Sequence, residues 1–184
     1  MDKIFPWRVT TDSLLNNTRI FSLHKVKAHS QQRSGVAGEF VYLDAPNWVN
    51  VIAVTPEQEI VLVQQYRHGT RTITTEIPGG MCDRGENFIT AGCRELLEET
   101  GYVGDAAKVI GVVHPNPAFQ NNSCATVLVE NAVAKQAQQL DPNEEICLLT
   151  IPLCEIPDKI RKGEITNSLV IAGFHMLHLH QSSQ

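Results

Sequence analysis

The chain has 184 residues, of which 42% are hydrophobic and 19% are charged, and its formal net charge is -5 at pH 7. That length supports one domain with a sizeable core and leaves little room for two. The acidic balance, without any run of Lys and Arg, argues against a nucleic-acid-binding surface. No apolar run reaches the length of a membrane span, and the N-terminal residues lack the apolar core of a signal peptide. We therefore expect a cytoplasmic protein with neither membrane nor nucleic acid as a partner.

Taken in chain order, the hydrophobic pattern predicts strands first and a mixture of strands and helices afterwards. The early strands are expected, between loops marked by Gly, Pro and Asn, at residues 18–23, 39–43, 48–54 and 60–66. A helix is expected between Gly85 and Gly101. Beyond it, strands are expected at 109–114, 125–130 and 146–152, and helices at 154–161 and 168–180. This order predicts an α/β fold with a mixed sheet.

The helix between the two glycines concentrates acidic side chains. Glu95, Glu98 and Glu99 lie about one turn apart and project from one side of the helix. Glu95 and Glu99 repel each other at this spacing, and Arg94 can reach Glu98 but cannot neutralise three carboxylates. Divalent cations are the natural counter-charge. Mg²⁺ suits the site best, because it takes a few carboxylates and completes its shell with substrate phosphates.

The alternative is a solvated acidic helix face, which explains most charge runs. The flanking glycines argue against it. Gly79 and Gly80 allow a loop to bring its backbone close to a metal or a phosphate, Gly85 permits a turn before the helix, and Gly101 suits the position just after its end. Loop, helix and glycine stop together indicate a metal-binding unit.

The segment GGMCDRGENFITAGCRELLEETGY also matches a known motif, G-x5-E-x7-R-E-U-x-E-E-x-G-U. The matching residues are Gly80, Glu86, Arg94, Glu95, Leu96, Glu98, Glu99, Gly101 and Tyr102. This is the Nudix box, so the chain resembles a Nudix hydrolase. Four further stretches resemble the ADP-ribose and nucleoside-diphosphate-sugar pyrophosphatase branch: VLVQQYRHG, EIPGG, HPNPAF and RKGEITNS.

The resemblance implies an α/β/α sandwich in which the box forms a loop, a helix and a loop. It places the Nudix hydrolase domain at residues 46–184 and an extra β-rich segment at residues 1–45. In this branch such a segment builds the dimer, so we expect a homodimer.

The resemblance also implies the metal ligands. They are the carbonyl of Gly79 and the carboxylates of Glu95 and Glu99, with Glu98 as a further or shared ligand, for Mg²⁺ or for Mn²⁺ in its place. Gly80, Glu86 and Arg94 are expected to support the box. The guanidinium of Arg94 suits a carboxylate fork with Glu86 that holds the loop on the helix.

Substrate contacts follow from the same resemblance. Arg67, at the end of a predicted strand, is placed to grip a substrate phosphate, and Glu76 is a second candidate for substrate binding. An exposed Arg with no ligand is the alternative for Arg67. Trp48 is the first candidate for stacking on the nucleobase, and Tyr42 and Trp7 are the reserves. For each aromatic residue, a core or dimer-interface position is the alternative.

In the resembled branch, the catalytic base comes from an acidic loop after the box, which matches DPNEEI at residues 141–146. Glu144 is the preferred candidate and Glu145 the alternative, with Glu98 as a further catalytic carboxylate. Either loop residue could instead be a solvated carboxylate.

The preferred function is Mg²⁺-dependent hydrolysis of the pyrophosphate of a nucleoside diphosphate sugar or ADP-ribose, giving a nucleoside monophosphate and a sugar phosphate. The alternatives are hydrolysis of nucleoside triphosphates or dinucleoside polyphosphates, and a non-catalytic sensor of nucleotide sugars. ADP-ribose, ADP-glucose and GDP-mannose are not separated by the sequence.

Overall fold

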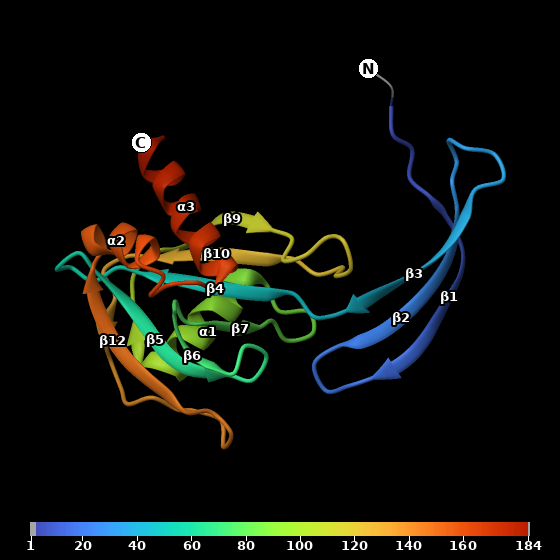
Figure 1. Ribbon diagram of the computed structural model, residues 1–184. Helices are drawn as coiled ribbons and strands as arrows, with labels where there is room; N and C mark the ends of the chain where they lie inside the picture. Colours follow the sequence, from blue (N-terminus) through green and yellow to red (C-terminus); the bar gives the residue numbers. More distant parts are fainter. Residues whose placement is uncertain (1–2, 184) are drawn as a thin grey trace. The chain divides into compact units, whose positions relative to one another are not determined.

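The computed structural model describes residues 3–183, which form two compact units (Figure 1). The first ends at Pro46 and includes His114–Asn122, and the second comprises Asn47–Val113 and the chain from Ser123 onward. Among the described residues, no helix has the length and apolar character that a bilayer span needs.

The first unit is an antiparallel sheet of β1 (Arg8–Asn17), β2 (Ser22–His29) and β3 (Ala37–Asp44), in that order. The predicted strand at 18–23 is wrong, because most of it forms the turn between β1 and β2. Thr18 Oγ1 donates to the carbonyl of Phe21 (2.6 Å) and accepts the Phe21 N–H (3.1 Å), so the turn satisfies its own backbone. The hydrophobic pattern did not reveal β1, since all ten of its residues are exposed.

The second unit is built on two sheets. One has the order β7 (Gly79–Met81), β4 (Trp48–Ala53), β10 (Cys124–Val129), β9 (Ala107–Val113), and the other β12 (Ile146–Pro152), β5 (Glu59–Arg67), β6 (Thr72–Glu76). β8 (Tyr102–Val103) and β11 (Val133–Ala134) form a short ribbon. β4 and β10 are parallel and the other pairings are antiparallel, which confirms the mixed sheet.

Helices cover both faces of this unit. They are α1 (Phe88–Thr100), α2 (Ile156–Arg161) after the 3₁₀ turn Leu153–Glu155, and α3 (Ser168–Ser182). The alternation along β4 divides the core, because Val49 and Val51 pack in one apolar cluster with Leu96 of α1, while Ile52 packs in the other with Val170 of α3. The α/β/α arrangement is therefore confirmed, with α1 on one side and α3 on the other (Figure 1).

Candidate active site

Helix α1 is delimited by two local signals. Asn87 accepts the backbone N–H of Thr90 at the N-terminus (3.0 Å), and Gly101, at φ 74°, ends the helix with its N–H on the carbonyl of Leu97 (2.8 Å). Its buried positions include Ala91 and Leu96, which pack in the core. This packing fixes the rotation of the helix and directs its carboxylates toward the loop that carries β7.

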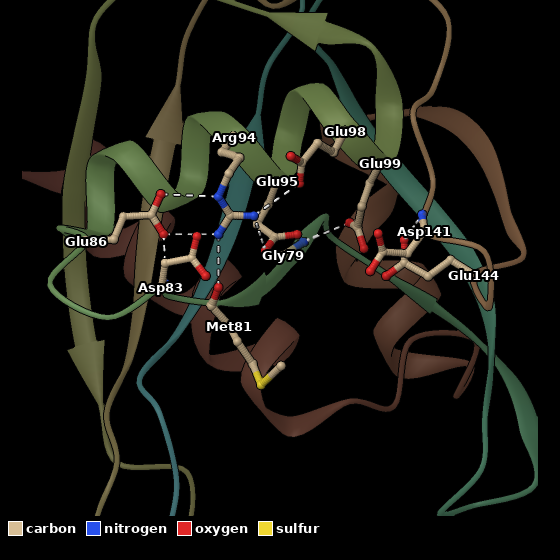
Figure 2. Close-up of polar contacts among 10 residues, drawn as sticks. All are labelled: Gly79, Met81, Asp83, Glu86, Arg94, Glu95, Glu98, Glu99, Asp141 and Glu144. Atoms are coloured by element: carbon tan, nitrogen blue, oxygen red, sulfur yellow. Dashed lines mark hydrogen bonds and ion pairs between the residues drawn. The ribbon is translucent and has the colours of Figure 1, made fainter. Parts of the chain in front are cut away.

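Arg94 makes most of the polar contacts that join α1 to the preceding loop (Figure 2). It forms a fork with Glu86, through Nε on Oε1 (3.2 Å) and Nη2 on Oε2 (3.0 Å), and Nη2 also donates to the Met81 carbonyl (3.0 Å). Nη1 donates to Glu95 Oε1 (2.8 Å) and Glu98 Oε2 (3.1 Å). The Arg94 hydrogen bonds hold the pKa of Glu86 below its usual range. Arg94 thus joins the loop to the helix and partly neutralises the acids.

Glu99 is the most deeply buried carboxylate of the helix, with 4% of its surface exposed. Its Oε2 accepts the backbone N–H of Gly79 (2.9 Å). Burial raises its pKa to about 8; the Gly79 hydrogen bond opposes the rise, and the charges of Glu95 and Glu144 add to it. Burial likewise raises the pKa of Glu95. Burial is therefore the main cause of the raised pKa of both carboxyl groups, and a nearby cation would oppose it.

Gly80 lets the β7 backbone approach these acids. A Cβ at this position would lie 2.5 Å from Glu95 Oε1 and 2.6 Å from its Cδ, so no larger residue fits without moving that carboxylate. A Cβ at Gly79 would collide with the carbonyl oxygen of Val49 in the neighbouring strand. Strand pairing and carboxylate packing together explain the two consecutive glycines.

The donor set fits a hard divalent cation. Within residues 3–183, no three His, Cys, Asp or Glu side chains are already gathered around one point as a metal site. Arg94 lies between Glu95 and Glu98, and the Glu98 side chain is 43% exposed. The candidate ligands are nevertheless carboxylate oxygens, and those of Glu95 and Glu99 are largely buried beside the β7 backbone. Oxygen ligands of this kind are what Mg²⁺ prefers. A cation here would offset the burial that raises the pKa of Glu95 and Glu99.

The loop after β11 brings Glu144 to this site. Glu144 lies next to Glu99 in Figure 2, and its charge contributes to the raised pKa of both Glu99 and Glu95. Its Oε2 accepts the N–H of Asp141 (3.1 Å), and its own N–H donates to the Asp141 carbonyl (2.9 Å), which closes the loop into a turn. Glu145 instead lines a different cavity, with Gln64, Tyr66 and Cys147.

Residues 46–168, more than half of the chain, match the model of the NUDIX domain. The chain belongs to the NUDIX family.

Several relatives are named as pyrophosphatases. An ADP-ribose pyrophosphatase of Saccharomyces cerevisiae is 36% identical over 109 residues, which cover 56% of this chain and 47% of that protein. An ADP-ribose pyrophosphatase of Bacillus subtilis is 27% identical over 152 residues, 82% of each chain. The chain thus spans about half the length of the yeast relative and most of the bacterial one.

A solved structure described as an ADP compounds hydrolase matches with a TM-score of 0.87 and 16% identity, covering 100% of this chain and 98% of that one. At this identity the likeness shows a shared fold. Family and relatives together support a hydrolase, and they confirm the resemblance to this branch.

Arg67 lies at the end of β5, outside the Nudix box, and pairs with Glu76 of β6. Its Nε donates to Glu76 Oε1 (2.9 Å) and its Nη2 to Glu76 Oε2 (2.8 Å). These bonds raise the pKa of Arg67, to which the charges of Glu99 and Glu144 also contribute. Arg67 and Glu76, the two candidate substrate-binding residues, thus lie on different strands and form one ion pair. This pair is close enough to Glu99 and Glu144 for their charges to act on Arg67.

The candidate aromatic residues belong to different units of the chain. Trp48 is half-buried in the Nudix domain. It lies opposite Met81 in the pairing of β4 and β7, and the Met81 carbonyl accepts a hydrogen bond from Arg94. In the N-terminal unit, Tyr42 donates to Asp12 (2.9 Å) and stacks on His24 (ring centroids 5.0 Å apart). Trp7 of that unit makes an edge contact with Phe40 (5.3 Å).

Sequence reasoning missed three residues that contact this site. Thr74 and Asn167 hydrogen-bond to the Glu76 carboxylate, and Gln138 Nε2 donates to the Glu99 carbonyl (2.6 Å). Asn167 carries one local signal, because Asn just before a helical pattern is a favoured helix cap. Nothing local marks Thr74 or Gln138, whose partners are brought to them by the fold.

Proposed function

We propose that the chain hydrolyses the pyrophosphate bond of a nucleoside diphosphate linked to a sugar or to ribose, in a divalent-metal-dependent reaction. The products would be a nucleoside monophosphate and a sugar phosphate. The observation that carries the proposal is the placement of Glu95 and Glu99, two largely buried carboxylates of one helix that lie against the backbone of Gly80 and Gly79. The ADP-ribose pyrophosphatase names of the relatives support the substrate class.

Bound Mg²⁺, or Mn²⁺ in its place, would lower the pKa of the attacking water and offset phosphate charge. The residues that would hold it are Glu95, Glu99 and the Gly79 carbonyl, with Glu98 shared. In this proposal Arg94 and Glu86 keep the β7 loop against the helix, which the hydrogen bonds of Arg94 to the Met81 carbonyl and to Glu86 support.

The proton of the attacking water goes to a carboxylate in this scheme. As oxygen bonds to phosphorus, the anhydride P–O bond breaks and the leaving phosphate takes the bonding electrons. We assign the base to Glu144, because it lies beside Glu99, whereas Glu145 faces a different cavity. Arg67 would grip a substrate phosphate, and Trp48 is the preferred stacking partner for the base.

The N-terminal residues 1–45 are proposed to form a homodimer interface, with residues 46–184 as the hydrolase domain. The described sheet of this segment exposes several large apolar side chains, which a second copy of the chain would bury. They are Val9, Leu14, Leu15, Phe40 and Val41. A cytoplasmic location stays a prediction.

The test is phosphate release, after coupling to a phosphatase, from ADP-ribose, ADP-glucose, GDP-mannose, UDP-glucose and a nucleoside triphosphate. Each is assayed with Mg²⁺, with Mn²⁺ and with chelator, and Glu99→Gln protein serves as the matched control. Metal-dependent release from the sugar nucleotides supports the proposal and ranks them. Release from the triphosphate alone would favour the first alternative, and binding without release would favour a sensor.

A further inference from the structure

The ion pair of Arg67 and Glu76 leaves one edge of the guanidinium available. Two of the five N–H groups, on Nε and Nη2, are used by the Glu76 carboxylate. Among residues 3–183, none accepts a hydrogen bond from Nη1, and the Arg67 side chain is 45% exposed. The free edge can therefore take a phosphate oxygen pair while the other edge stays fixed. The direction in which this free edge points depends on how firmly the Glu76 carboxylate is held.

Glu76 is held by more than Arg67. Only 3% of its surface is exposed, and its oxygens accept two further hydrogen bonds. Thr74 Oγ1 donates to Oε1 (2.6 Å), and Asn167 Nδ2 donates to Oε2 (2.9 Å). Burial alone would raise the pKa of Glu76, but the bonds from Arg67, Thr74 and Asn167 and the charge of Arg67 outweigh it and lower the pKa. The carboxylate stays ionised because each of its two oxygens accepts two hydrogen bonds.

Asn167 reaches Glu76 from the start of α3. Its Oδ1 accepts the backbone N–H of Leu169 (3.0 Å), so the same side chain caps the helix. We propose that Asn167 is a positioning residue for substrate phosphate, acting through Glu76 on the free edge of Arg67. The inference rests on the proposed function, because it takes Arg67 as the phosphate-binding group.

The chemistry of the side chain explains why an amide stands here. Asp, Ser and Thr also cap helices well. An ionised Asp has no donor for Glu76 and would place a second negative charge against it, while the Ser hydroxyl is too short to serve both partners. The two partners also fix the orientation of the amide, since Leu169 needs the oxygen and Glu76 needs the N–H. Among these favoured helix caps, only Asn supplies an acceptor and a separate donor.

The test compares Asn167→Ser and Asn167→Asp, which both keep a favourable helix cap. For the best substrate of the panel, Asn167→Ser should raise KM roughly 3- to 10-fold, the range for the net loss of one ordinary hydrogen bond, because Asn167 acts on the phosphate only indirectly. Asn167→Asp should raise KM further, because the new carboxylate repels Glu76. Both substitutions should change kcat by a smaller factor than they change KM. In an Arg67→Lys background, which cannot form the fork, Asn167→Ser should leave KM nearly unchanged.

A second readout follows the guanidinium directly. In the nitrogen-15 spectrum, the Arg67 Nε–H signal is identified by its loss in Arg67→Lys, and its exchange with water should be faster in Asn167→Ser. Denaturation curves show that each variant is folded. Unchanged KM and unchanged exchange in both Asn167 variants would leave Asn167 as a helix cap only and overturn the inference. So would an equal KM effect with and without the arginine.

Failure of the proposed function gives a different result. If no member of the panel is hydrolysed by the wild-type protein, the substrate assignment is wrong. A normal KM for Arg67→Lys would remove phosphate binding from Arg67, and with it the inference, while leaving the hydrolase intact.

Discussion

Replacing Glu99 by Gln should stabilise the metal-free protein at alkaline pH. Burial raises the pKa of Glu99 from 4.5 to about 8, against the hydrogen bond from Gly79 and with help from the charges of Glu95 and Glu144. The folded protein thus holds this proton more tightly than the unfolded chain does. The stability contributed by the protonated carboxyl is fully present below the unfolded pKa of 4.5 and is lost as the pH rises through about 8.

The size of the effect follows from the two pKa values. A rise from 4.5 to about 8 corresponds to about 5 kcal/mol, at about 1.36 kcal/mol for each tenfold change in proton affinity. Relaxation and water entry reduce this in real proteins, so we expect a gain of roughly 2 to 5 kcal/mol at pH 9. Gln has nearly the same shape, stays neutral, and keeps an oxygen for the Gly79 N–H.

The assay is urea denaturation of wild type and Glu99→Gln at pH 5 and pH 9, with chelator present. The free energies of unfolding should be similar at pH 5 and favour the variant at pH 9. Adding Mg²⁺ should then reduce the difference in the free energy of unfolding at pH 9, because the metal stabilises the wild type. Glu98→Gln is the matched control, because it lies one residue earlier with a 43% exposed side chain and should show a much smaller pH-dependent gain. A difference between wild type and Glu99→Gln that is the same at both pH values would refute this account of the buried carboxylate.

Four substitutions test the assigned roles. Glu99→Gln should cut turnover by roughly 10³ or more, because it removes a ligand that stabilises the transition-state charge, and activity retained in pure enzyme would refute the metal assignment. Glu144→Gln should lower kcat with little change in metal affinity, measured by Mg²⁺ titration of activity. Glu145→Gln should leave kcat near wild type, and the opposite order would transfer the base to Glu145. Gly80→Ala should weaken metal binding, seen as a higher Mg²⁺ concentration at half-maximal rate, since its Cβ would lie 2.5 Å from Glu95 Oε1; an unchanged titration would show that the strand shifts freely.

The box helix could be predicted because its signals are local. The cap at Asn87, the stop at Gly101 and the spacing of the acids all lie within one short segment. The strand at 18–23 could not be excluded in the same way, because the Thr18 hydroxyl satisfies the backbone of the turn there. Strand β1 was hidden because its ten residues are all exposed, so no alternation of polar and apolar residues marks it.

The contacts around the helix depend on tertiary structure. Glu144 and Glu145 are equivalent in sequence, and only the fold directs one toward Glu99 and the other into a separate cavity. Asn167 and Glu76 lie 91 positions apart, so their hydrogen bond could not be inferred from a local pattern. The sequence located Arg67 by resemblance, but its fork with Glu76 needed the register of β5 and β6.

The charges of the site fall into two groups, the acidic residues of α1 and its loop and the ion pair of Arg67 and Glu76. On α1 and its loop, Arg94 is the single cation in contact with the carboxylates of Glu86, Glu95 and Glu98, so these contacts leave a net negative charge. The charge of Arg67 lowers the pKa of Glu99 but does not offset its burial. Because Arg67 is already paired with Glu76, its free edge is better matched to a phosphate than to a second carboxylate. A divalent cation would therefore supply the positive charge that the acids lack, and the free edge of Arg67 would take a phosphate oxygen, and a metal-bound pyrophosphate brings both.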